Sequence, residues 1–202
     1  MLTQAGSALK WLEHDPPEVH EARTSIEKVM WSAQRCADMI HGLRNLVLGA
    51  ADPIERIDVN ALVVQALHLS NDVAEFGHDR VVCDLDPDAG WISACRVQLD
   101  IMLLNLLSNA TKAMEGGGPA PVLTVRTRRE GGGVRVTILD DGHGIDAQDS
   151  ADLFRPFAST REGRLGLGLS ICRHIIAQHG GRIDIENVAG GAAVDVYLPD
   201  GD

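Results

Sequence analysis

The chain has 202 residues, a formal net charge of −11, 45% hydrophobic residues and only 3% aromatic residues. This hydrophobic content is enough to bury a core and excludes a disordered chain, and the acidic balance argues against binding nucleic acid, which needs an excess of Lys and Arg. No apolar run approaches the roughly 20 residues needed to cross a bilayer, so we expect a cytoplasmic chain without membrane contact, while a membrane anchor in a longer parent protein stays open.

The first 51 residues have the pattern of a helical hairpin. Residues 2–13 predict a short helix that ends at Asp15-Pro16-Pro17, and a second helix is expected from about 19 to 48. The second helix has apolar residues at alternating steps of four and three, namely Ala22, Ile26, Val29, Ala33, Cys36, Ile40, Leu43 and Val47. Two helices cannot bury such a stripe, so we expect half of a dimeric four-helix bundle, with packing on a neighbouring domain of the same chain as the alternative.

The segment Gly49–Pro53 breaks this helix and predicts a second domain over residues 52–202. Its pattern mixes helices and strands. We expect helices at 60–76, 95–115 and 168–179, and strands at 81–85, 122–128, 134–139, 182–187 and 192–198. This order predicts an α+β fold, a sandwich in which helices cover one face of a mixed sheet.

The four cysteines, Cys36, Cys83, Cys95 and Cys172, are scattered and show no C-x-x-C spacing. We therefore expect buried, reduced thiols rather than a metal site or disulfides.

Three polar residues share one face of the apolar helix 95–115. Asn105, Asn109 and Lys112 follow one another at steps of four and three, which places them on one side of a helix. Amide oxygens can ligate Mg²⁺ and an ammonium group can bind a phosphate, whereas the alternative is a solvated stripe on a surface helix.

Two glycine-containing segments follow later in the chain. Asp140, Gly142 and Gly144 come directly after a predicted strand, where a carboxylate can accept a hydrogen bond from an exocyclic amine and glycines let the backbone pass close to a planar ring. An ordinary turn is the alternative. Gly166 and Gly168 open a helix whose exposed N–H groups suit a polyphosphate, and the aperiodic segment before them has the length of a mobile lid.

In this order, Asn105–Lys112, Asp140–Gly144, Leu153–Phe157 and Gly166–Ile171 resemble the four boxes of the ATP-binding domain of two-component sensor histidine kinases. The resemblance covers roughly residues 57–199. It implies the nucleotide fold shared by histidine kinases, type II topoisomerases, heat-shock chaperones and mismatch-repair ATPases, with ATP and Mg²⁺ as cofactors.

The resemblance also implies roles for individual residues. Asn109 would ligate Mg²⁺, and Asn105 and Lys112 would face the phosphates. Asp140 would bind the adenine amino group in a pocket shaped by Gly142 and Gly144. The remaining nucleotide-binding residues would be Gly166, Leu167 and Gly168 beside the triphosphate and Thr160 and Arg161 in the lid.

The residue four positions before Asn109 favours a kinase over a hydrolase. Hydrolytic members of this superfamily carry a Glu there as a general base, whereas Asn105 cannot accept a proton. The phosphoacceptor box of the form H-E-x-N-Q-P-L does not occur here, and we expect its histidine upstream of Met1.

The expected function is therefore transfer of the ATP γ-phosphate to a histidine absent from this chain and then to the receiver domain of a response regulator, by a homodimer joined through the N-terminal helices. The alternatives are a Ser/Thr anti-sigma-factor kinase of the same superfamily and a nucleotide-binding phosphotransfer or scaffold protein. One departure concerns Cys95, which stands where relatives often carry Asp, so the cap of that helix is expected to be missing or supplied by Ser93.

Overall fold

The computed structural model describes residues 2–14, 17–26, 29, 53–77, 80–115, 120–145, 153–155 and 168–201. The chain divides into two compact units, Met1–Asp52 and Pro53–Asp202. In the part of the chain described, no helix combines the length and apolar character needed to span a membrane.

The first unit begins with helix α1, Leu2–Leu12, as the sequence predicts. The chain turns after it, where the Glu18 amide donates to the Trp11 carbonyl oxygen at 2.9 Å, and residues 19–26 are helical again. Ala22 of the predicted apolar stripe is buried, while Ile26 is 45% exposed. The stripe beyond residue 29 lies outside the described residues, so the dimeric bundle stays a prediction.

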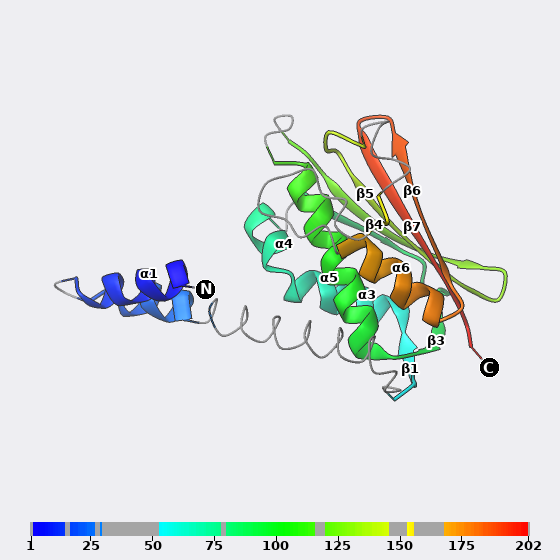
Figure 1. Cartoon of the computed structure of the whole chain (residues 1–202), viewed down its shortest axis with the longest axis horizontal. Helices are drawn as coiled ribbons and strands as arrows, with labels where there is room; N and C mark the ends of the chain where they lie inside the picture. The colour runs from blue at the N-terminus through cyan, green and yellow to red at the C-terminus, as the bar shows by residue number, and fades with distance from the viewer. Residues whose placement is uncertain are drawn as a thin grey trace. The chain divides into compact units, whose positions relative to one another are not determined.

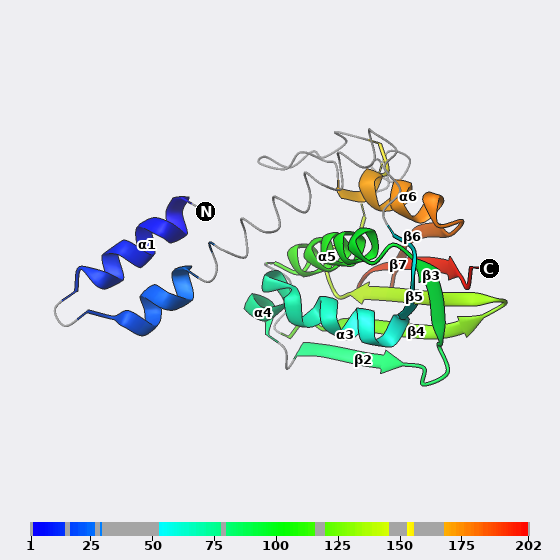
Figure 2. The same ribbon diagram turned by 90° about the horizontal axis from the view of Figure 1, so that it is seen from below.

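The second unit is built on a five-stranded mixed sheet with the order β2-β4-β5-β7-β6. β2 runs parallel to β4, and all the other neighbours are antiparallel. The strands are β2 Val81–Leu85, β4 Leu123–Glu130, β5 Gly133–Asp140, β6 Arg182–Val188 and β7 Gly191–Pro199. The helices of this unit lie on one face of the sheet (Figures 1 and 2), which confirms the predicted α+β architecture.

Among the residues that the structure describes, the helices on this face are α3 Val59–Leu69, α4 Asn71–Phe76, α5 Arg96–Ala113 and α6 Gly168–Gln178. The prediction of a single helix over 60–76 is wrong, because the chain forms two helices there that are separated at Ser70. Ser70 has extended backbone angles, and its hydroxyl oxygen accepts a hydrogen bond from the Val73 amide at 3.3 Å. Ser favours such capping positions over helix interiors, which explains the break.

A small second sheet pairs β1, Glu55–Asp58, with β3, Trp91–Ala94, in antiparallel register. The sequence analysis predicted neither strand. Each has only four residues, which is too short for an alternating pattern to stand out from its surroundings.

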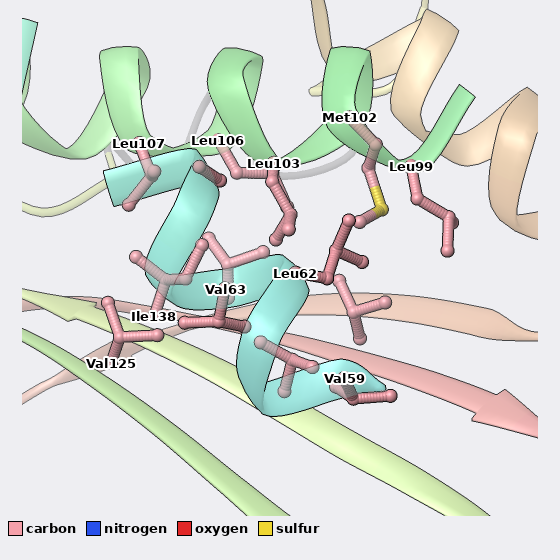
Figure 3. Packing of buried hydrophobic residues seen from close by; sticks show 14 of the residues in the cluster. Val59, Leu62, Val63, Leu99, Met102, Leu103, Leu106, Leu107, Val125 and Ile138 are labelled. Carbon is pink, nitrogen blue, oxygen red and sulfur yellow. The ribbon is translucent and has the colours of Figure 1, made fainter. Parts of the chain in front are cut away.

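The core lies between the sheet and α5. Leu99, Leu103 and Leu106 are at most 2% exposed, so this helix, predicted to be largely apolar, buries one face in the core. Figure 3 shows these side chains pointing toward α3 and the sheet, where Val125 and Ile138 rise from β4 and β5. The opposite, polar face of α5 is thereby left for other contacts.

Cys95 is the N-cap residue of α5 and makes no side-chain cap hydrogen bond, so the missing cap at this position is confirmed, while capping by Ser93 stays a prediction. The backbone N–H of Cys95 instead donates to Nε2 of His179 at 3.0 Å. Nδ1 of the same imidazole lies 2.8 Å from the Ile175 carbonyl oxygen, which fits a neutral ring with its proton on Nδ1. His179 therefore ties the start of α5 to the end of α6.

The expectation of buried thiols holds for Cys95 and Cys172 and is wrong for Cys83, which is exposed on β2. β2 is an edge strand, and its middle residues face solvent. Burial raises the pKa of the Cys172 thiol to about 12. Cys36 lies outside the described residues.

This difference in exposure predicts selective alkylation of the folded protein. Burial also raises the pKa of the exposed Cys83 thiol. Iodoacetamide at pH 8 should still modify Cys83 much faster than Cys172, because only the thiolate is nucleophilic and Cys172 is both buried and almost fully protonated at this pH. Peptide mass mapping measures both rates, and in denaturant the two thiols should react alike. Equal rates in the folded protein would contradict the burial of Cys172.

Candidate nucleotide-binding site

Two amide side chains on the polar face of α5 meet the start of α6. A Cβ atom placed on Gly168 would lie 3.8 Å from Asn105 Oδ1 and 3.9 Å from Asn109 Nδ2. Asn105 Nδ2 donates to the Ile101 carbonyl oxygen at 3.0 Å, which orients Oδ1 of this amide away from its own helix backbone. The structure therefore brings together three residues that the sequence predicted to share a site.

Lys112, one helical turn further along α5, is engaged by side chains. Its Nζ lies 3.4 Å from Asp72 Oδ2 on α4 and 2.5 Å from Ser108 Oγ. About a third of the Lys112 side chain is exposed. A phosphate that binds this ammonium group must therefore compete with Asp72, a partner that the sequence analysis did not identify.

Asp140 ends β5 and is only 5% exposed. Burial raises the pKa of its carboxyl above the usual value, and hydrogen bonds from the amides of Gly142 and Ala192 oppose this shift. The Gly142 amide donates to Oδ1 at 2.9 Å. The carboxylate is thus held in one orientation by the backbone around it, as a group that recognises a donor must be.

The loop after Asp140 packs against the end of α5. A Cβ atom on Gly142 would lie 2.6 Å from the Ala113 carbonyl oxygen, so no larger residue fits there. The His143 amide donates to the same oxygen at 3.2 Å. Because Ala113 lies one turn beyond Asn109, the loop of Asp140 and the amide face of α5 belong to one region of the fold.

Gly144 adopts a φ of 70°, in the left-handed region that glycine favours. A Cβ atom there would lie 2.8 Å from Asn187 Oδ1. Asn187, near the end of β6, bonds to the backbone of Ile145 through both halves of its amide. The sequence analysis missed Asn187, because Asn before a glycine-rich hairpin turn is the ordinary residue of such a turn.

The remaining predicted site residues, Thr160, Arg161, Gly166 and Leu167, lie outside the described residues, and their roles stay predictions. Within the described ranges, no group of three or more His, Cys, Asp or Glu side chains is placed to hold a metal ion.

Residues 95–202 match the family described as histidine kinase-, DNA gyrase B- and HSP90-like ATPase, and the chain belongs to this family. Its curated relatives include the C4-dicarboxylate transport sensor protein DctS of Rhodobacter capsulatus, 30% identical over 96% of this chain. The sensor histidine kinase ZraS of Klebsiella oxytoca is 32% identical over 94% of this chain. The chain spans 30% of the length of DctS and 41% of ZraS.

Solved structures agree with this assignment. The catalytic domain of the histidine kinase ThkA superposes with a TM-score of 0.63 at 26% identity, over 73% of this chain and 96% of that chain. The resemblance to the ATP-binding domain of sensor histidine kinases is therefore confirmed, and so is the nucleotide fold that it implied.

Proposed function

We propose that this chain is the ATP-binding catalytic portion of a sensor histidine kinase, which transfers the ATP γ-phosphate to a histidine and then to a response regulator. The observation that carries the proposal is the meeting of Asn105 and Asn109 with Gly168, next to the loop of Asp140, in a chain of this ATPase family. Relatives named as sensor histidine kinases favour this function over an anti-sigma-factor kinase or a scaffold.

The residues of α5 fit a magnesium nucleotide. A half-turn of the Asn109 amide exchanges its nitrogen and oxygen, so that the oxygen can ligate Mg²⁺ while phosphate oxygens and water supply the other ligands. Bound Mg²⁺ would neutralise charge that develops on the phosphates. In this proposal Lys112 pairs with a phosphate after release from Asp72, and Gly166, Leu167 and Gly168 flank the triphosphate.

Asn105 explains why transfer to a protein is favoured over hydrolysis. An amide cannot take a proton from water, and the Asn105 nitrogen is already engaged with the Ile101 carbonyl oxygen. The site therefore lacks a general base at the position where hydrolytic members of the superfamily carry Glu. Catalysis then depends on positioning and charge neutralisation, with the histidine of a bundle helix as the nucleophile.

The partners and surroundings follow from the same proposal. The N-terminal unit would join two copies in a four-helix bundle, and a response regulator receiver domain would accept the phosphate from the histidine. We also propose that the chain works in the cytoplasm, and that Thr160 and Arg161 belong to a lid over the nucleotide.

Replacing Asn109 by alanine tests the proposal. We expect calorimetry with a non-hydrolysable ATP analogue and Mg²⁺ to show affinity lowered by at least about tenfold, because the variant loses the protein ligand to the metal. Gln98→Ala is the matched control, since this amide lies on the same helix about 16 Å before Asn109 at about 1.5 Å per residue. Wild-type protein that binds no nucleotide, or an Asn109 variant with unchanged affinity, would contradict the proposed function.

A further inference from the structure

Asn187 holds the residue that follows the Asp140–Gly144 loop. Its Oδ1 accepts a hydrogen bond from the Ile145 amide at 2.7 Å, and its Nδ2 donates to the Ile145 carbonyl oxygen at 2.8 Å. One side chain thus satisfies both backbone groups of a single residue, as a neighbouring strand would. Only one orientation of the amide group allows this pairing.

Gly144 makes the approach of Asn187 possible. Any side chain at this position would begin 2.8 Å from Asn187 Oδ1 and 3.3 Å from the Gly191 carbonyl oxygen. It would also have to adopt a φ of 70°. Glycine at this position therefore allows the close approach of Asn187 and also the left-handed backbone conformation of the loop.

The same hairpin, β6–β7, also contacts the beginning of the loop. Ala192 is the register partner of Asp140 in the sheet. A Cβ atom on the preceding residue, Gly191, would lie 2.9 Å from the Gly142 nitrogen. The end of this hairpin consequently supports the loop at both ends, through the sheet at Asp140 and through the Asn187 side chain at Ile145.

We propose that Asn187 is a positioning residue that keeps the Asp140–Ile145 loop in the conformation that recognises the nucleotide base. This inference rests on the proposed function. Asn187 acts through Ile145 and makes no contact with the nucleotide in this proposal. Its side chain is exposed, so its two hydrogen bonds add little to the stability of the fold. Their main consequence is the placement of the loop.

Comparing the affinities for two nucleotides that differ in their base can distinguish a positioning role of Asn187 from a general role in stability. If Asp140 accepts a hydrogen bond from the adenine amino group, a hypoxanthine base is disfavoured, because it presents a carbonyl oxygen there. A loop released from Asn187 should lose affinity for the adenine nucleotide and keep its weak affinity for the inosine nucleotide. A variant that merely unfolds more easily would bind both nucleotides less well.

The experiment uses the full chain with Asn187→Ala, Asn187→Asp and the neighbouring control Glu186→Ala. Non-hydrolysable ATP and inosine triphosphate analogues are titrated with Mg²⁺ by calorimetry, and amide hydrogen exchange is followed at Ile145. Asn187→Asp retains the acceptor for the Ile145 amide but places a carboxylate oxygen against the Ile145 carbonyl oxygen, so it should not restore the contact.

We expect both Asn187 variants to bind the ATP analogue about three- to tenfold more weakly, with the inosine analogue little changed and faster exchange at Ile145. Glu186→Ala should behave as wild type. Unchanged ATP-analogue affinity, or an equal loss for both analogues, would overturn the positioning role while wild-type binding upholds the proposed function. Wild-type protein that binds neither analogue would overturn both proposals.

Discussion

Asparagine in place of Asp140 is expected to weaken adenine-nucleotide binding by about ten- to a hundredfold, because a charge-assisted hydrogen bond to the base is lost. The substitution preserves size, and its amide oxygen can still accept from the Gly142 amide, which donates to Oδ1 in the wild-type protein. The loop should therefore keep its shape. Calorimetry with a non-hydrolysable ATP analogue measures the effect, and unchanged affinity would rule out Asp140 as the base-recognition group.

The same variant changes the dependence of stability on pH. Burial raises the pKa of the Asp140 carboxyl in the folded protein, so the ionised carboxylate costs folding free energy at any pH above that value. This cost disappears as the pH falls through the raised pKa, since the neutral form is the one that burial favours. The stability of Asp140→Asn relative to wild type should be highest at neutral pH and should decline on acidification.

Urea denaturation of both proteins between pH 4 and 8 tests this sign, since subtracting the two curves removes the contributions of all other titrating groups. If the difference in unfolding free energy between the two proteins did not change with pH, the raised pKa of Asp140 would be contradicted. A variant that is less stable than wild type at neutral pH, and relatively more stable in acid, would show that the hydrogen bonds from Gly142 and Ala192 outweigh desolvation.

The main architecture could be predicted because its helices and strands have sequence patterns that extend over many residues. The 18 residues of α5 carry an apolar face and a polar face, and both are as expected in the structure. The strands predicted at 122–128 and 134–139 are β4 and β5 of the structure, with bounds shifted by at most two residues. In each case many residues repeat one pattern, so a single exception does not obscure it.

The structure differs from the sequence-based predictions at places where a single residue determines the local structure. Ser70 divides a predicted helix because its hydroxyl caps the next one, and a lone serine does not reveal in sequence which of these roles it takes. Cys83 is exposed because β2 lies at the sheet edge, which depends on strand order rather than on local pattern. Local sequence carries no information about either the order of strands or the edge.

The residues that form hydrogen bonds or ion pairs with the site residues could not be predicted, for a related reason. Asp72 is 40 residues from Lys112, and Asn187 is 42 residues from Ile145. The motifs indicate which residues face a nucleotide, but the residues that hold them come from α4 and β6, where acidic and amide side chains are ordinary surface choices. Such supporting contacts become visible only once the sheet order and the helix packing are known.

Alanine at Gly191 is expected to destabilise the catalytic unit by about 3 kcal/mol, the upper part of the range for overpacking in a closely packed region. A Cβ atom at this position would overlap the Asp140 carbonyl oxygen and would lie 2.7 Å from the Asp140 carbonyl carbon and 2.9 Å from the Gly142 nitrogen. These neighbours are backbone atoms of β5 and its loop, which cannot rotate away as a flexible side chain would. The start of β7 must therefore separate from the end of β5.

Gly190→Ala is the matched control, because Gly190 has a φ of 96° and a Cβ atom placed on it would meet no described atom within 4 Å. It should cost only backbone strain, about 1 kcal/mol. Urea denaturation compares the two variants, and nucleotide affinity should fall in Gly191→Ala alone, since that substitution displaces Asp140 and Gly142 together. Two equally stable variants that both bind nucleotide as wild type does would contradict this prediction. The ends of β5 and β7 could then move apart freely, and the close contact between the β6–β7 hairpin and the Asp140 loop would not determine the shape of the site.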